Sequence, residues 1–232
     1  MTLFERYLRG EQAEVYAELY SMGEDALSQS NFIQTDLILK ETFNRVKYNL
    51  EVIYNELKQL DYRFYSETEI QKLPLVPPET DIDKQLVDFK ARIANEKNLP
   101  LSLEYFYRIV GTCNFCWNWI KNPEIPWEGS DPLEIPPVSF LNECISDNYD
   151  SSDILLSGDY LQKDNISGSC YKLQLTSELQ IDSLLLHECW DIPFIEYLRI
   201  TIFNCGFSMA DQVGDSDLDS FCTRVRPLLQ KI

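Results

Sequence analysis

The clearest helical pattern in the chain is VKYNLEVIYNELKQL, which occupies residues 46–60. Its apolar residues recur in steps of four and three, with polar residues between them. This spacing puts the apolar side chains on one face of an α-helix. The members of that face are Val46, Leu50, Ile53, Leu57 and Leu60. We therefore predict a long amphipathic helix over residues 31–61.

Upstream of this segment, residues 3–20 also show helical spacing, and Met22-Gly23 ends the pattern. The two segments together predict an N-terminal helical hairpin. The apolar face of residues 31–61 packs on this partner or on the body of the fold. An alternative is that it serves a structural role, forming a homo-oligomer through helix 31–61. Two heptads are too few to define a coiled coil, so both uses stay open.

Downstream, short helical and strand patterns follow one another in irregular order. Predicted helices cover 81–96, Leu103–Val110, Val138–Ile145, Phe194–Asn204 and Asp217–Val225. Thr80 is the expected N-cap of the first helix and Ser102 that of the second, and Gly111 fits the left-handed position at the end of the second. Predicted strands cover Tyr62–Tyr65, Thr112–Trp119, Leu133–Ile135, Ile154–Leu156, Tyr171–Leu175 and Ser183–His187. This order favours an α+β fold with a mixed or antiparallel sheet flanked by helices.

The length of 232 residues fits one large domain. We predict a single domain over 1–232, with a helical N-terminal part over about 1–61 and an α+β body over about 62–232. Pro74, Pro77 and Pro78 predict an extended connector near the boundary between the two parts.

The charge of the chain is strongly negative, with 38 acidic and 20 basic residues and a net charge of −18. Acidic residues are in excess in the first, middle and last thirds alike. Such a field repels nucleic acid and anionic lipid and speeds the encounter with a basic protein. Solubility alone is the simpler explanation of the same excess.

The cysteines and the N-terminus predict a cytoplasmic protein without membrane spans. The first residues lack the basic and apolar regions of a signal peptide, and no apolar run has membrane-spanning length. Seven cysteines cannot all be paired within one chain, so we expect free thiols. Cys113 and Cys116 form a C-x-x-C motif, and a thiol-based enzyme is one interpretation of it. The other cysteines lack zinc-site spacing, so buried structural thiols are the alternative we favour.

No catalytic residue, metal ligand or cofactor site is predicted. His187 is the only histidine, and a triad with Glu188 or Asp191 lacks the nucleophile motif that would support it. A calcium loop starting at Asp215 fails, because Ser220 and Arg226 stand where glycine and glutamate are needed. An acidic helix N-terminus explains these residues better, because carboxylates favour the positive end of the helix dipole.

Trp117, Trp119 and Trp127 lie within eleven residues of one another, beside a proline-rich segment. Tryptophan is enriched at the centres of protein interfaces. In a strand, Trp117 and Trp119 would share a face. We predict these three residues as the binding site. The alternative is that they seal one edge of the core.

Residues 81–210 carry short motifs that are similar to those of uncharacterised bacterial proteins resembling the SUKH (Smi/Knr-like) superfamily. The motifs are Leu99-Pro100-Leu101-Ser102-Leu103, Tyr105-Phe106-Tyr107, Val110-Gly111, Asn114-Phe115, Asp131-Pro132-Leu133, Asp159-Tyr160, Asn165-Ile166-Ser167-Gly168, Tyr171, Phe194–Arg199 and Gly206-Phe207. The chain departs from the pattern at Ser169-Cys170 and at Asn204-Cys205-Gly206. The resemblance carries no catalytic residue.

The resemblance implies an α+β fold used for protein binding, and many SUKH members look like immunity proteins that neutralise toxins. We therefore predict a non-enzymatic, acidic protein-binding protein of immunity type that occludes a basic partner or toxin. It is expected to bind neither nucleic acid nor membranes. The alternatives are the thiol enzyme at Cys113 and Cys116 and the oligomerisation module.

Overall fold

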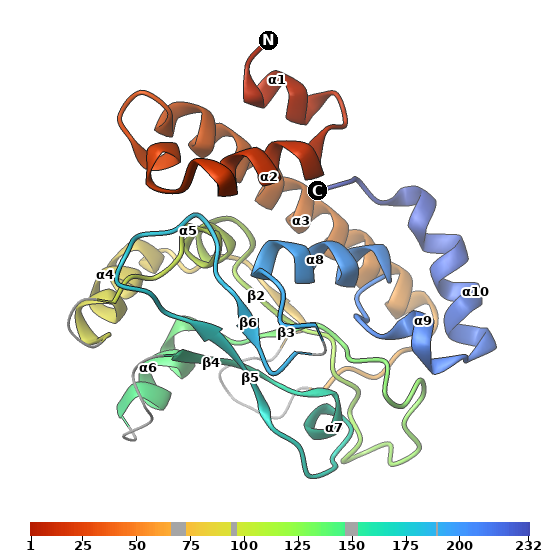
Figure 1. Ribbon diagram of the computed structural model, residues 1–232. Helices are drawn as coiled ribbons and strands as arrows, with labels where there is room; N and C mark the ends of the chain where they lie inside the picture. Colours follow the sequence, from red (N-terminus) through yellow and green to blue (C-terminus); the bar gives the residue numbers. More distant parts are fainter. Residues whose placement is uncertain (66–72, 94–96, 147–152, 189) are drawn as a thin grey trace.

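The computed structural model describes residues 1–65, 73–93, 97–146, 153–188 and 190–232 (Figure 1). Helices predominate in it, and the named strands form two three-stranded sheets. Every strand pair in both sheets is antiparallel. The predicted α+β fold is confirmed, with two small antiparallel sheets in place of one mixed or antiparallel sheet.

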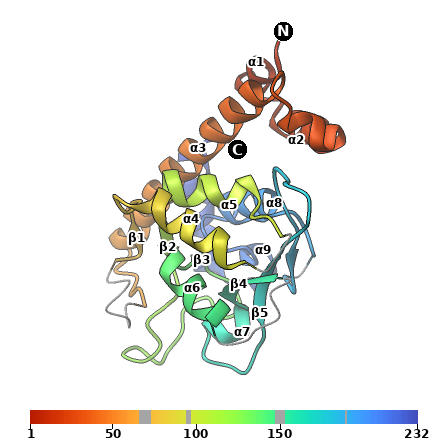
Figure 2. The same cartoon turned by 90° about the vertical axis from the view of Figure 1, so that its left-hand side faces the viewer.

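The N-terminal helices are α1 (Leu3–Leu8), α2 (Gln12–Met22) and α3 (Phe32–Gln59), with a 3₁₀ turn over Gly23–Leu27. Thr2 and Glu5 form a capping box that starts α1. The predicted helix over 3–20 is wrong in its continuity, because Gly10 has a φ of 105°, which interrupts it. In place of a two-helix hairpin, α1 and α2 both lie at the N-terminal end of α3 (Figure 2).

The first sheet has the strand order β1 (Leu75–Val76), β2 (Thr112–Asn114) and β3 (Glu134–Ile135). The second sheet has the strand order β4 (Asp153–Gly158), β5 (Cys170–Gln174) and β6 (Leu185–Leu186). The predicted strand Thr112–Trp119 ends at Asn114, whose Oδ1 accepts the Cys116 N–H at 2.9 Å. A local hydrogen bond from the backbone to a side chain competes with the backbone hydrogen bonds that join neighbouring strands. Beyond it, Trp117 and Phe64 pair only as an isolated bridge.

The helices of the body are α4 (Ile82–Arg92), α5 (Leu101–Tyr105), α6 (Val138–Ser146), α7 (Tyr160–Lys163), α8 (Phe194–Phe203), α9 (Ala210–Val213) and α10 (Ser216–Val225). A π-helical turn over Phe106–Val110 continues α5, and a 3₁₀ turn over Arg226–Leu228 follows α10. All five helices predicted for the body are therefore present, with shifted ends.

Two predicted N-caps are wrong. The N-cap of α4 is Asp81 and not Thr80, and that of α5 is Pro100 and not Ser102. The end of the predicted helix 81–96 falls at 94–96, outside the described residues. Gly111 does end its helix with a positive φ of 94°, and a Cβ there would lie 2.1 Å from the Val76 carbonyl oxygen. No other residue type fits that close approach.

The core forms around α3. Val46, Leu50, Ile53 and Leu57 are fully buried against other parts of the same chain, whereas Leu60 at the C-cap is 45% exposed. Helices α1, α5, α8 and α10 all contact α3. The predicted apolar face is therefore buried inside the fold, and a homo-oligomer formed through that face would have to uncover it.

The buried apolar side chains form one cluster that extends from Tyr7 to Ile232. The C-terminal tail closes this core, since Asn49 on α3 donates to the Gln230 carbonyl and accepts the Gln230 N–H, both at 2.8 Å. The helical N-terminal part and the body thus share their core. Among the described helices, none combines the length and apolar character of a membrane span.

Candidate functional site

The three predicted tryptophans do not form one site. Trp117 and Trp127 line one pocket, and Trp119 lines another. The shared strand face predicted for Trp117 and Trp119 is wrong, because the strand ends at Asn114 and the Trp119 N–H donates back to the Trp117 carbonyl at 3.0 Å, where a turn begins.

The first of these pockets, here called the aromatic pocket, has a volume of about 540 Å³. Its aromatic residues are Tyr62, Trp117, Trp127 and Phe221. The Trp127 ring is stacked between Tyr62 and Phe221, with 5.6 Å between ring centroids on each side. Trp117 packs edge-on against Tyr62 at 5.1 Å. The pocket thus joins the loop after β2 to the C-terminal end of α3 and to α10.

Both tryptophans of the aromatic pocket also have a structural role. The Trp117 Nε1–H donates to the Asn122 carbonyl at 2.7 Å, which closes the loop between them. Trp127 adopts a φ of 59°, a backbone conformation that is unusual for a bulky residue. Packing on both ring faces holds it there. Each ring nevertheless keeps part of its surface exposed.

Two carboxylates line the aromatic pocket. They belong to Asp61 and Asp217, and both residues are exposed. The basic residue on the rim is Arg224, whose guanidinium lies 3.5 Å from Glu56. Asp61 pairs with Arg63. Carboxylates therefore outnumber cations around these aromatic rings.

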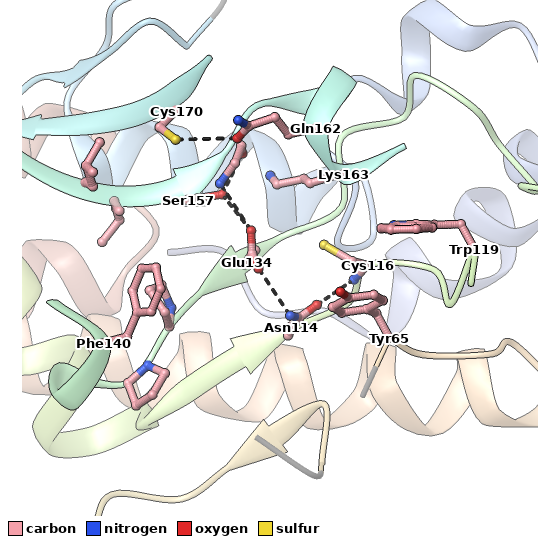
Figure 3. Close-up of a pocket in the computed structure, with 15 residues that line it drawn as sticks. Tyr65, Asn114, Cys116, Trp119, Glu134, Phe140, Ser157, Gln162, Lys163 and Cys170 are labelled. Atoms are coloured by element: carbon pink, nitrogen blue, oxygen red, sulfur yellow. Dashed lines mark hydrogen bonds between the residues drawn. The ribbon is translucent and has the colours of Figure 1, made fainter. Parts of the chain in front are cut away.

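The second pocket, here called the Glu134 pocket, has a volume of about 350 Å³ and lies between the two sheets (Figure 3). Residues of β2, β3, β4, β5, α6 and α7 line it, so it depends on most of the body. Phe140 lies toward one end, and Tyr65 and Trp119 lie toward the other. The Glu134 side chain projects between them.

Polar side chains surround Glu134. Its Oε1 accepts from the Asn114 Nδ2 at 3.2 Å, and its Oε2 accepts from the Gly158 N–H at 3.2 Å. The Ser157 hydroxyl lies 3.4 Å from Oε2. An apolar pocket with a few convergent polar groups is the usual form of a small-molecule site.

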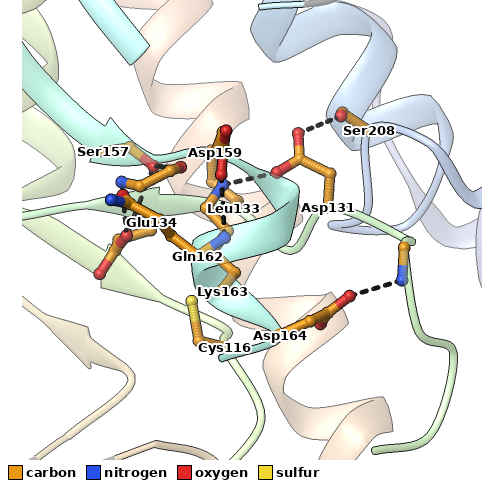
Figure 4. Close-up of polar contacts among 12 residues, drawn as sticks. Cys116, Asp131, Leu133, Glu134, Ser157, Asp159, Gln162, Lys163, Asp164 and Ser208 are labelled. Carbon is orange, nitrogen blue, oxygen red and sulfur yellow. Dashed lines mark hydrogen bonds and ion pairs between the residues drawn. The ribbon is translucent and has the colours of Figure 1, made fainter. Parts of the chain in front are cut away.

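Next to the Glu134 pocket, a buried ion pair fixes α7 (Figure 4). Lys163 Nζ lies 2.7 Å from Asp131 Oδ1, and both side chains are almost completely buried. Burial opposes the charge on Lys163, but Asp131 and the neighbouring Tyr171, Cys116 and Glu134 together outweigh burial and hold the pKa of Lys163 above its usual value. Asp131 also accepts the Ser208 hydroxyl. Lys163 therefore stays charged and has a structural partner, which argues against a catalytic lysine.

A second contact ties α7 to the loop that carries Trp127. Asp164 Oδ2 accepts the Gly129 N–H at 2.6 Å. Burial raises the pKa of Asp164 to about 6. The two pockets are thus held relative to each other by the neighbouring residues Lys163 and Asp164.

Cys113 and Cys116 are both buried, and burial raises the pKa of each thiol well above its usual value. A protonated thiol is a poor nucleophile, so their environment works against the thiol-enzyme interpretation. Cys116 does line the Glu134 pocket. Cys113, Cys116, Cys170, Cys205 and Cys222 are free cysteines, while Cys189 lies outside the described residues. Within the described ranges no group of His, Cys, Asp and Glu has metal-site geometry.

His187 is exposed just after β6. Asp191 accepts the His187 backbone N–H at 3.1 Å. Asp215 is the N-cap of α10, which agrees with the predicted acidic helix start.

The sequence interpretation missed Glu134, Asp131 and Lys163. Glu134 carried a signal, since an acid between Leu133 and Ile135 in a predicted strand must face away from the core side of that strand. Lys163 and Asp131 carried none, because their pairing spans 32 positions and depends on the tertiary fold.

A scan against protein-family models, a search of curated proteins and a search of solved structures each found no match to this chain. The SUKH resemblance therefore stays a prediction.

Proposed function

We propose that this chain is a non-enzymatic binding protein that docks a basic protein through the aromatic pocket. The observation that carries the proposal is the pairing of partly exposed tryptophan rings with exposed carboxylates on one rim. Tryptophan supplies contact area at interface centres, and rim charges accelerate encounter with an oppositely charged partner.

The whole-chain charge supports the same proposal. A net charge of −18 favours approach of a basic protein from any direction, and the rim acids then orient it. An immunity-type role, in which the chain occludes a basic toxin in the cytoplasm, is the form of this function that the SUKH resemblance implies. The free thiols of Cys113, Cys116, Cys170, Cys205 and Cys222 are compatible with that compartment.

The test begins with the partner that the wild-type protein captures from its own cells. We expect that partner to be basic, and its association rate to fall about tenfold or more between about 50 and about 500 mM salt. The rim variant Asp61→Asn/Asp217→Asn should slow association further than the control Glu14→Gln/Glu24→Gln. The control removes two exposed acids at α2 and the turn that follows it.

Stopped-flow measurement of both variants at low salt decides the question. An association rate that does not change with salt, or that falls equally in the rim variant and the control, would contradict docking at the aromatic pocket. An acidic partner would contradict the proposal as a whole.

A further inference from the structure

Glu134 is placed by its strand to face the Glu134 pocket. Its neighbours Leu133 and Ile135 are fully buried, whereas Glu134 is only half-buried. Alternation along the strand explains this, because successive side chains point to opposite faces. Figure 3 shows the carboxylate between the aromatic residues of the two ends.

The hydrogen bonds of Glu134 come from neutral donors and leave acceptor capacity free. The bonds from Asn114 and Gly158 are both 3.2 Å long. The single Ser157 hydroxyl proton has a closer acceptor, the Gly158 carbonyl at 2.8 Å, so its 3.4 Å contact with Glu134 is the weaker one. A carboxylate offers about four acceptor positions. Charged donors would bind it more strongly than these do.

No basic side chain in the described part of the chain forms an ion pair with Glu134. Lys163 also lines the pocket, but its Nζ is held 2.7 Å from Asp131. Lys163 therefore attracts Glu134 only at longer range, while its ion pair is made with Asp131. A partly desolvated carboxylate is stabilised by any cation that reaches it.

The pocket walls suit the apolar part of a cationic ligand. Tyr65 and Trp119 are stacked at 5.6 Å, with their planes 23° apart. Phe140 stands at the other end, and Leu155 and Pro137 complete the apolar wall. Aromatic faces attract cations, most strongly where water is excluded.

We propose that the Glu134 pocket binds a ligand that carries one cationic group, an amine or a guanidine, on an apolar stem. Glu134 accepts the cationic group, and the aromatic ends enclose the stem. The volume of about 350 Å³ lies in the usual range for small-molecule pockets. This proposal does not depend on the aromatic pocket, and it holds whether or not that pocket docks a protein.

The test compares a cationic probe with its neutral isostere. Phenylbutylamine and phenylbutanol have the same apolar body, and acetyl-arginine methylamide represents a protein side chain. Binding is measured by calorimetry and by NMR shifts of the Trp119 indole and the Gly158 amide. We expect phenylbutylamine to bind wild type about tenfold or more tightly than phenylbutanol. Tighter binding of acetyl-arginine methylamide than of the amine would identify a protein side chain as the ligand source.

Glu134→Gln keeps the shape of the side chain and removes its charge. We expect this variant to bind the amine and the alcohol equally, while Glu14→Gln on α2 keeps the wild-type preference. Equal binding of both probes by wild type, or no shift at Trp119 and Gly158 with either cation, would overturn the proposal. The wild-type comparison alone decides it if Glu134→Gln does not fold.

Discussion

Asp182 is a buried carboxylate that joins three parts of the chain. Its Oδ2 accepts the Tyr20 hydroxyl of α2 and the Ile195 N–H in the first turn of α8, both at 2.9 Å. Its Oδ1 accepts the Ser183 N–H, also at 2.9 Å. Burial raises the pKa of Asp182 to about 6, and the hydrogen bonds only partly oppose this. The contact between the N-terminal helices and the body therefore depends on a carboxylate that is costly to ionise.

The raised pKa of Asp182 predicts a loss of stability as pH rises. Between its unfolded pKa near 3.8 and its folded pKa of about 6, the folded state binds more protons than the unfolded state. The free energy of unfolding should therefore fall across this window, and Asp182 should contribute about 2 kcal/mol of the fall between about pH 4.5 and pH 7. Urea denaturation of wild type and Asp182→Asn at both pH values measures this contribution.

Glu14→Gln serves as the matched control, since Glu14 is exposed on α2. It should keep the wild-type pH dependence, because an exposed carboxylate gains little from folding. Identical pH dependence in wild type and Asp182→Asn would show that Asp182 has an ordinary pKa.

At the scale of elements, α10 shows how a cluster of acids stabilises a helix start. Asp215 Oδ1 accepts the N–H groups of Asp217 and Leu218, at 2.8 and 3.0 Å. Asp217 and Asp219 lie in the first turn, where the helix dipole favours negative charge. The helix carries Phe221, which stacks on Trp127. The acids of this segment thus serve the helix and, through it, the aromatic pocket.

Asp215→Ala should lower the free energy of unfolding by about 1 kcal/mol, because it removes the side-chain acceptor at the N-cap. Asp215→Asn keeps a side-chain acceptor and should lower the free energy of unfolding by only about a few tenths of a kcal/mol. The matched control is Asp219→Ala, an exposed first-turn acid that caps no backbone group. Chemical denaturation of the three variants tests the assignment, and equal losses for Asp215→Ala and Asp219→Ala would contradict it.

At the scale of the whole molecule, α3 makes the N-terminal part and the body one folding unit. Its buried face supplies Val46, Leu50, Ile53 and Leu57 to a cluster that also contains residues of α5, α8 and α10. Removing this helix would expose the facing side chains of the body. The boundary predicted near residue 61 therefore separates an all-helical part from an α+β part and does not separate two cores.

A chain limited to residues 62–232 should not fold cooperatively. Loss of each large buried side chain costs several kcal/mol, and the total stability of a domain is only about 5–15 kcal/mol. Near-UV circular dichroism and thermal denaturation, with the full chain as reference, measure the outcome. A cooperative transition with a native near-UV spectrum would show that the body has an independent core.

The sequence alone determined the features that depend on neighbouring residues. The period of Val46, Leu50, Ile53 and Leu57 predicted α3, because helical spacing is local. The charge excess and the α+β class also follow from the sequence. The tertiary structure decided the sites. The strand that was expected to align Trp117 with Trp119 ends at Asn114. The pocket around Glu134 is formed by strands and helices that are distant in sequence. Such pairings carry no local pattern, because they arise only when packing brings separate elements together.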